Sequence, residues 1–519
     1  MAEAEHGKPA PELLPVDGGA AALAAVAKVE RRRVERLRAL LEVAKALASE
    51  HDLDRLLHMV ADEVKKVVEC DRCSVFLVDE ERREIWTVVA HGLEPKVLRL
   101  PVGSGIAGYV ALTGETVSIP DCYADTRFNP EVDRQTGYRT NNMLCVPMVR
   151  SRGDVAGVMV AINKLPSGAF DSEDEELLAA LGANAATAVD NARLQDEIEA
   201  LFEGFVQASV LAIESRDPST SGHSARVAVL TLGLADAIER APPSELRHVR
   251  FGAEAKREIR YAALLHDFGK VGVREHVLVK ANKLYPFEHE LLKARFELVR
   301  ATVLLEGERR RAKLFEASGA AGKEREIEVL EHELAGRLTE LHGFWDFLCA
   351  CDRPTVLAEG DFARLKELSA KRWADLDGVA RPLLTEREVE TLSIRRGSLS
   401  PEERREIESH VEHTYRFLAQ IPWTRTLARV PDIAYAHHEK LDGGGYPRRL
   451  GPKQIPLEAR MMTVADIYDA LTASDRPYKK AVPHEKALDI LSDEAKRGQL
   501  DPSLLQIFIE ARVHERLGR

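Results

Sequence analysis

Strand-like spacing of apolar residues is confined to the part of this 519-residue chain before about residue 205. Before that point, the apolar runs at 74–78 and 85–90 enclose a charged turn, which is typical of a strand hairpin, and amphipathic helices flank the strand region. After it, strand signals almost vanish and helical patterns dominate. The chain is also too long for a single hydrophobic core. The sequence therefore predicts a multidomain protein, with an α+β domain followed by an all-α domain.

The composition and the spacing of apolar residues predict the domain boundaries. Residues 1–35, rich in Ala, Glu, Pro and Gly, predict a disordered or helical tail. Residues 36–196 form the predicted α+β domain and residues 205–519 the helical domain. A helix at 184–215 is expected to connect the two domains without a break.

The connecting helix carries a narrow apolar stripe. Leu194, Ile198, Leu201 and Phe205 follow one another at spacings of four, three and four. This pattern is typical of a parallel coiled coil, so we expect a homodimer joined through this helix. The alternative interpretation is one face of an ordinary intramolecular helix.

Charge and cysteine content limit the function classes. The formal net charge of -12 argues against a nucleic-acid polymer or a membrane surface as partner, but leaves a small anionic substrate open. Six cysteines are too few for a disulfide framework in a chain of this length, and the lone Cys70-x-x-Cys73 is interpreted as packing residues. No apolar run has the length of a membrane helix. We expect a cytoplasmic protein.

Polar clusters interrupt the helical half where burial is expected. His266-Asp267 and His437-His438 each follow a short apolar run, and Asp466 ends a third. Burying such groups costs several kcal/mol unless they are paired or bind a metal. One such cluster is more often a hydrogen-bonded core network, whereas three favour a metal site.

The segments around these clusters resemble a known family. Residues 437–447 read HHEKLDGGGYP, 266–270 read HDFGK, 217–224 read DPSTSGHS and 465–472 read ADIYDALT, with RPYK at 476–479. These blocks, and their order along the chain, resemble the signatures of the HD-GYP family of cyclic di-GMP phosphodiesterases. The resemblance implies an all-α HD-superfamily fold and metal-dependent hydrolysis of cyclic di-GMP to linear pGpG, with or without a second cut to GMP.

The resemblance also implies a ligand set. The family's metal positions carry over to His223, His266, Asp267, His437, His438 and Asp466. A further histidine is expected after a KLTxEE-like turn, but the first such turn, at 284–288, leads to Arg295, which stays protonated and cannot bind a metal. A second copy, at 399–403, leads to His410 at the same offset. We therefore predict His410 as the ligand, with His289 as the alternative, and residues 296–396 as an insertion.

Seven donors exceed the capacity of one ion, so we expect two divalent metals bridged by Asp267, which is predicted as a catalytic residue. Nitrogen and oxygen ligands without cysteine favour iron or manganese. Family members with a third metal resemble this chain except for an acidic residue four positions before the first histidine. Ser219 stands there, which favours two metals.

Substrate contacts follow from the same blocks. Lys270 is predicted to hold a phosphate oxygen, the alternative being a structural pair with an acidic neighbour. The other predicted contacts are Gly443, Gly445, Tyr446, Pro447, Arg476 and Lys479. In the family the Gly-Tyr-Pro loop is also linked to protein partners. Another cyclic dinucleotide as substrate, or a catalytically weak module that binds a signal or a protein, are the alternatives.

Residues 36–196 resemble a GAF domain. Asn163-Lys164, Phe170 and Asp174-Glu175 reproduce the NKFDE spacing found in GAF domains of cyclic-nucleotide phosphodiesterases. The resemblance implies that the Lys–Asp pair is a structural tie near the pocket. The pocket itself has three alternatives: cyclic AMP or GMP, another small molecule, or no ligand in a dimerisation module. We predict that this domain regulates catalysis through the connecting helix.

Overall fold

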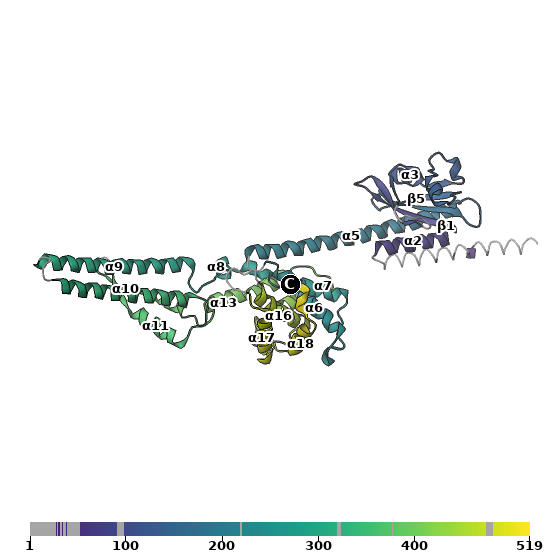
Figure 1. Cartoon of the computed structure of the whole chain (residues 1–519). Helices are drawn as coiled ribbons and strands as arrows, with labels where there is room; N and C mark the ends of the chain where they lie inside the picture. The colour runs from purple at the N-terminus through teal and green to yellow at the C-terminus, as the bar shows by residue number, and fades with distance from the viewer. Residues whose placement is uncertain are drawn as a thin grey trace, which may run out of the picture. The chain divides into compact units, whose positions relative to one another are not determined.

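The computed structural model of the chain divides into two compact units, Met1–Phe202 and Glu203–Arg519 (Figure 1). The residues it describes are 52–90, 98–217, 221–318, 323–375, 377–473 and 481–518, with single helical positions between 27 and 38. Apart from those positions, the predicted tail at 1–35 lies outside the described residues. The same is true of Ser219, Arg476 and Lys479.

The first unit is built on a six-stranded antiparallel sheet with the strand order β3-β2-β1-β6-β5-β4. The predicted hairpin is confirmed as the β1–β2 pair, in which Val78 faces Ile85. The strands are β1 (Cys70–Asp79), β2 (Glu84–Ala90), β3 (Arg99–Pro101), β4 (Val117–Ile119), β5 (Met143–Val149) and β6 (Val155–Lys164).

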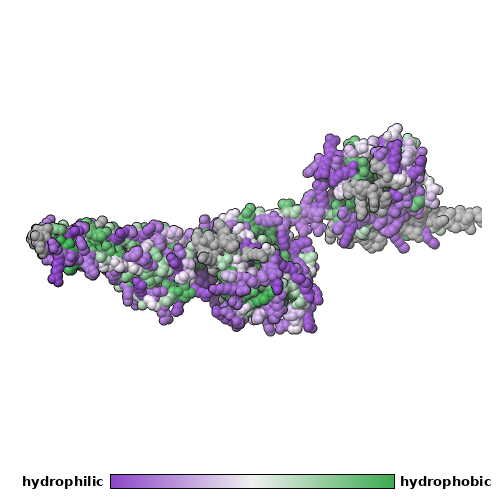
Figure 2. Space-filling view, viewed as in Figure 1, coloured by the Kyte–Doolittle hydropathy of each residue, from purple (hydrophilic) through white to green (hydrophobic). Residues whose placement is uncertain are grey.

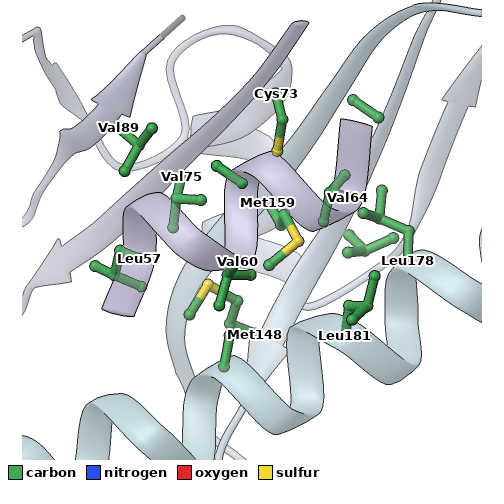
Figure 3. Close-up of a cluster of buried hydrophobic side chains, with 14 of the residues drawn as sticks. Leu57, Val60, Val64, Cys73, Val75, Val89, Met148, Met159, Leu178 and Leu181 are labelled. Carbon is green, nitrogen blue, oxygen red and sulfur yellow. The ribbon is translucent and has the colours of Figure 1, made fainter. Parts of the chain in front are cut away.

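Each face of this sheet has its own apolar core. On one face, α2 (Leu53–Val67) and the first part of α5 (Ser172–Arg216) cover side chains such as Val75 and Met159 (Figure 3). Cys73 is buried in this core, as expected of a packing residue. On the other face lie α3 (Gly105–Thr113), η1 (Cys122–Ala124) and α4 (Glu131–Thr136). The α+β fold predicted for this region is confirmed.

The NKFDE residues fasten the end of β6. Lys164 Nζ lies 2.7 Å from Asp174 Oδ1 and donates to the Val68 carbonyl at 2.7 Å, so β6, α5 and the end of α2 are joined. Asn163 has a φ of 56° and its side-chain oxygen accepts from the Asn141 amide. Phe170 is buried in the adjoining core, while Glu175 is half-buried.

The second unit is almost entirely helical, and the all-α prediction is confirmed apart from one small two-stranded sheet. Its helices before the predicted insertion are α6 (His223–Arg240), η3 (Ser244–Leu246), α7 (Ala253–Leu265), η4 (Phe268–Gly272) and α8 (Glu275–Leu278). Those after it are α13 (Pro401–Glu408), α14 (His410–Leu418), α15 (Val430–Tyr435), α16 (Leu457–Thr472), α17 (His484–Lys496), α18 (Pro502–Glu510) and η5 (Val513–Leu517).

Between these two sets lies a separate helical hairpin. It consists of α9 (Pro286–Ser318), α10 (Glu324–Asp352), α11 (Glu359–Ala370), β7 (Arg372–Ala374), β8 (Ala380–Pro382) and α12 (Glu386–Leu392). Its apolar core already includes Leu284 and Leu292, which precede the predicted insertion boundary at residue 296. The two ends meet where Ser398 Oγ donates to the Lys280 carbonyl at 3.1 Å.

Helix α5 is unbroken from Ser172 to Arg216 and includes the predicted connecting segment at 184–215. The four residues of its apolar stripe are exposed, with Ile198 at 66% and Leu201 at 75%. Exposure on this scale is what a coiled-coil face needs before it pairs. The homodimer itself stays a prediction.

The Lys164–Asp174 pair gives a stability prediction. Asp174 is fully buried and Lys164 is 12% exposed, so Asp174→Ala leaves a cation without its partner in the protein interior. We expect the free energy of unfolding of the first unit to fall by about 3–5 kcal/mol. Glu131→Ala, which removes the exposed pair with Arg134, should cost at most about 1 kcal/mol. Urea denaturation followed by circular dichroism compares the two, and equal losses would contradict the structural role of the tie.

Candidate metal centre

Seven side chains of the second unit converge in three overlapping groups. The first group holds Asp267, His410, His437 and His438; the second holds His223, His266 and Asp267; the third holds His266, His437 and Asp466. Within each group the ligand atoms lie within 4.8 Å of one another. The structure therefore brings together all seven predicted ligands, although they come from segments up to 243 residues apart.

The hydrogen bonds of three histidines fix their tautomer. His266, His410 and His437 each direct Nδ1 at the carbonyl three residues earlier, at 2.7, 2.6 and 2.6 Å. A carbonyl can only accept, so Nδ1 carries the proton and Nε2 keeps a lone pair. All three Nε2 atoms are buried and have no hydrogen-bond partner in the protein. A metal ion satisfies this arrangement, which is the usual outer-shell pattern of a metal-binding histidine.

Asp267 lies where the first two groups meet. Its Oδ1 is 3.2 Å from His410 Nε2, whereas its Oδ2 is 3.4 Å from His266 Nε2 and 3.8 Å from His223 Nε2. The two oxygens thus face different sets of histidines. This is the geometry that a carboxylate bridging two cations requires.

His223 is oriented by a carboxylate that the sequence analysis did not single out. Asp469 Oδ2 lies 2.8 Å from His223 Nδ1, and Arg226 binds both oxygens of Asp469 at 2.7 and 3.0 Å. Asp469 is fully buried. It stands three residues after Asp466 on α16, hence on the same helix face, and that spacing is the signal from which it could have been found.

A close backbone approach explains the glycine of the HDFGK segment. A Cβ on Gly269 would lie 1.9 Å from the His410 carbonyl oxygen, so only glycine fits there. The Thr414 hydroxyl accepts from the Gly269 amide at 2.8 Å and donates to the His266 carbonyl at 3.0 Å. Thr414 therefore joins α14 to the segment that carries Asp267, and it too was missed by the sequence analysis.

Electrostatics keep the carboxylates ionised and two histidines neutral. Burial acts to raise the pKa of Asp267, but the charge of Lys270 outweighs it and holds that pKa well below its usual range. Burial lowers the pKa of His438 to about 3, so that its ring is neutral near pH 7. Neutral imidazole and ionised carboxylate are the forms that bind metals.

His223 differs from the other histidines. Burial acts to lower its pKa, but hydrogen bonds to Asp466 and Asp469 outweigh burial and raise the pKa to about 9. Its Nε2 lies 3.2 Å from Asp466 Oδ1. Binding of a metal at this nitrogen therefore requires loss of a proton.

Lys270 lies on η4, a 3-10 helix, and its Nζ is 2.9 Å from Asp267 Oδ2 and 3.7 Å from Asp217 Oδ2. The sequence left open whether it holds substrate or pairs with an acidic neighbour. The ion pair is present, and it places a cation beside the Asp267 carboxylate; the contact with substrate stays a prediction.

The predicted Gly-Tyr-Pro loop folds back over the double histidine. The Tyr446 ring lies 4.8 Å from the His438 ring, and a Cβ on Gly445 would come within 2.3 Å of the Lys440 amide nitrogen. Buried Glu439 accepts from the Arg448 and Leu450 amides at 2.7 and 2.8 Å. The loop, which continues through Gly443 and Pro447, is thus fastened by Glu439.

The excluded Arg295 and His289, the alternative to His410, both lie in the hairpin. Arg295 Nη1 is 2.6 Å from Glu388 and also donates to the Leu383 carbonyl, while His289 Nδ1 is 3.2 Å from Asp352. Neither belongs to a metal-binding group among the described residues. His410, in contrast, is 2% exposed within the cluster.

The first unit contains a cavity of about 120 Å³ on the α3 face of its sheet. Apolar side chains such as Phe76, Phe128 and Met143 line it, together with Ser104 and Asp133. None of the NKFDE residues lines it, so the motif lies outside the cavity wall.

Three family models match parts of the chain. A GAF domain model matches residues 52–189, an HD domain model matches 220–337, and a second HD domain model matches 387–504. The first HD match contains the ligand candidates up to Asp267, and the second contains those from His410 onward. The chain thus combines a GAF domain with an HD domain, and the unmatched residues 338–386 fall within the hairpin.

Curated relatives match smaller parts of the chain. The dual 3',5'-cyclic-AMP and -GMP phosphodiesterase 11A of Takifugu rubripes is 40% identical over 147 residues, 26% of this chain and 16% of that protein. A probable 3',5'-cyclic phosphodiesterase, pde-5 of Caenorhabditis elegans, is 35% identical over 192 residues, 34% of this chain and 26% of that protein. This chain therefore spans about a quarter or less of the length of these relatives.

Among solved structures, the GAF domain of a phosphoenolpyruvate-protein phosphotransferase from Coxiella burnetii is 24% identical. The match covers 31% of this chain and 96% of that one, with a TM-score of 0.29. Within the described residues, no helix is both long enough and apolar enough to span a membrane.

Two histidines of α14 allow a matched test of the ligand set. His410 lies in the cluster, whereas His413, three residues later, lies beside Ser409 and Gly272. We expect His410→Ala to lower the metal content measured by plasma emission spectrometry, and His413→Ala to leave it unchanged. Full metal content in His410→Ala, or an equal loss in both variants, would contradict the predicted role of His410.

Proposed function

We propose that this chain is a GAF-regulated, metal-dependent phosphodiesterase that hydrolyses cyclic di-GMP to linear pGpG. The observation that carries the proposal is the set of three buried, unpartnered Nε2 atoms around Asp267. An apolar interior does not tolerate such atoms without a ligand. Two divalent cations, with iron or manganese favoured by the nitrogen and oxygen donors, would polarise a phosphodiester and acidify a water molecule.

The residues of the chain would then divide the work. Asp267 would hold both cations, since its two oxygens face different histidines. Lys270 neutralises charge beside Asp267 and holds a phosphate oxygen. Asp469 keeps the His223 ring in the orientation that directs Nε2 at the site.

The choice of a cyclic dinucleotide rests on the Gly-Tyr-Pro loop. Tyr446 lies against His438, so the loop forms a wall of the site and would contact the base or the sugar of a bulky substrate. Arg476 and Lys479 complete the family's substrate contacts by resemblance alone.

A second candidate is hydrolysis of cyclic AMP or cyclic GMP, as in the names of the curated relatives. Those matches cover about a third of this chain or less. Because Asn163, Lys164, Phe170, Asp174 and Glu175 reproduce the NKFDE spacing of GAF domains in cyclic-nucleotide phosphodiesterases, we assign the mononucleotide to the GAF domain as a regulatory ligand, and the dinucleotide to the HD domain.

Turnover of cyclic di-GMP by protein purified without oxygen tests this assignment directly. We expect pGpG formation with about two metal ions per chain, and loss of both in the His266→Ala, Asp267→Ala double variant. A double variant in the exposed part of the hairpin, Val356→Ala with Val379→Ala, should keep both the metal ions and pGpG formation.

The remaining outcomes separate the alternatives. Hydrolysis of cyclic AMP or GMP in place of cyclic di-GMP would move the mononucleotide to the catalytic site. Metal binding without hydrolysis of any cyclic nucleotide, with or without cyclic mononucleotide added, would favour the signal-binding module.

Regulation is proposed to run through α5. The helix starts in the GAF domain and continues to Arg216, and Glu203 near its end binds Arg260 of α7 at 2.6 and 2.8 Å. Helix α7 ends directly before His266. A shift of α5 would therefore move α7 through the Glu203–Arg260 pair, and α7 is covalently continuous with the ligand His266.

We expect Ile198→Pro to uncouple the GAF ligand from catalysis, because proline removes a helix hydrogen bond and costs about 3 kcal/mol in a helix interior. Ile198→Ala, which shortens the same exposed side chain but keeps the helix, is the control. Turnover with and without cyclic mononucleotide is the measurement. Regulation that survives in Ile198→Pro would exclude α5 as the route.

A further inference from the structure

The outer face of α9 carries a second apolar stripe that the hairpin core does not use. Its members follow one another at spacings of four, three, four, three and four: Phe287, Leu291, Ala294, Leu298, Ala301 and Leu305. The four large residues are 61, 62, 40 and 38% exposed in chain order. Figure 2 shows hydrophobic surface along the α9–α10 part of the chain.

This stripe is distinct from the one that holds the hairpin together. The inner stripe consists of Leu292, Phe296, Val299 and Val303, all of which are buried. Each residue of the inner stripe stands five positions after a residue of the outer stripe. This offset corresponds to about 140° around a helix of 3.6 residues per turn. Helix α9 is therefore apolar on two faces, of which α10 covers one.

We propose that the outer stripe of α9 pairs with α9 of a second copy of this chain, in antiparallel orientation. The alternating spacing of three and four is the pattern of a coiled-coil seam, and it continues for almost three heptads. A pair of identical helices related by a two-fold axis is the commonest way in which one surface closes on itself.

The side-chain sizes favour the antiparallel orientation. With the two-fold axis between residues 299 and 300, Leu298 faces Ala301 of the second copy and Leu305 faces Ala294. The two central layers then each join one leucine and one alanine, whereas the outer layers join Leu291 with Glu308 and Phe287 with Ala312. A parallel pair would instead alternate layers of two leucines with layers of two alanines, and the alanine layers would leave space unfilled.

The flanking charges agree with this register. Glu290 and Arg311 stand immediately before the stripe positions 291 and 312, on the exposed side of α9. In the antiparallel pair they face each other across the seam, twice by symmetry. In a parallel pair Glu290 would meet Arg295, whose guanidinium already binds Glu388 at 2.6 Å, whereas Arg311 makes only longer contacts of 3.9 Å with Glu308 and Glu331.

The association is measured by sedimentation equilibrium of the full chain, in an Ile198→Lys, Leu201→Lys background that removes the α5 stripe. We expect this protein to form a dimer and to become monomeric when Leu298→Lys and Leu305→Lys are added. Val356→Lys with Val379→Lys, which changes more exposed residues away from the stripe, should leave the dimer intact. A monomer in the background protein, or a dimer that survives the two α9 substitutions, would overturn the proposal.

Charge reversal and cross-linking test the orientation. Glu290→Arg should weaken the dimer, and Glu290→Arg with Arg311→Glu should restore it. Leu291→Cys protein mixed with Glu308→Cys protein should give a disulfide-linked pair, whereas Leu291→Cys alone should not link to itself. Self-linking of Leu291→Cys would show a parallel pair and contradict the inferred register, and circular dichroism confirms that each variant is folded.

Discussion

The buried Asp267 carboxylate is the interaction on which the helical unit depends. Its Oδ1 faces His410 of α14, and its Oδ2 faces His223 of α6, His266 and Lys270. A carboxylate that is 4% exposed is stable in an ionised form only when cations or strong donors surround it. The segments before and after the hairpin therefore meet at the two oxygens of Asp267, and both segments must fold so that their cations and donors reach this carboxylate.

The outer hydrogen bonds make this arrangement rigid. Three histidines hold their rings by Nδ1 bonds to carbonyls of their own helical turn, and His223 does so through Asp469 and Arg226. Each ring can therefore present Nε2 in one direction only. Because these bonds lie within or beside the helix that carries the ligand, the site is set by local structure before any metal is bound.

The sequence predicted the clustered residues well and their supports poorly. His266 and His437 stand out because a polar group at the end of an apolar run has few structural explanations, whereas His223 was predicted from the family resemblance. Thr414 and Asp469 were missed because a threonine, or a second aspartate on the same helix, has many structural explanations. Gly269 was read as part of a motif, and only the distance to the His410 carbonyl shows why no side chain fits there. The predicted start of the insertion, residue 296, is later than the start of the hairpin core, which includes Leu284 and Leu292. These two residues have the same periodicity as the helices around them, so nothing in the sequence marks the boundary.

The hairpin can stand beside a ligand-bearing helix because its two ends are tied together outside the cluster. Lys280 Nζ binds Glu403 at 2.8 Å, and the Lys280 carbonyl accepts from Ser398, so the chain leaves and re-enters the HD domain at one place. Lys283 and Leu284 then bond to Asp352 and Leu392 within the hairpin. An added segment that closes on itself in this way places little strain on its host, since the cost of closing a loop depends on the distance between its ends and only weakly on its length. His410 therefore lies only twelve residues after Ser398, where the chain returns from the hairpin.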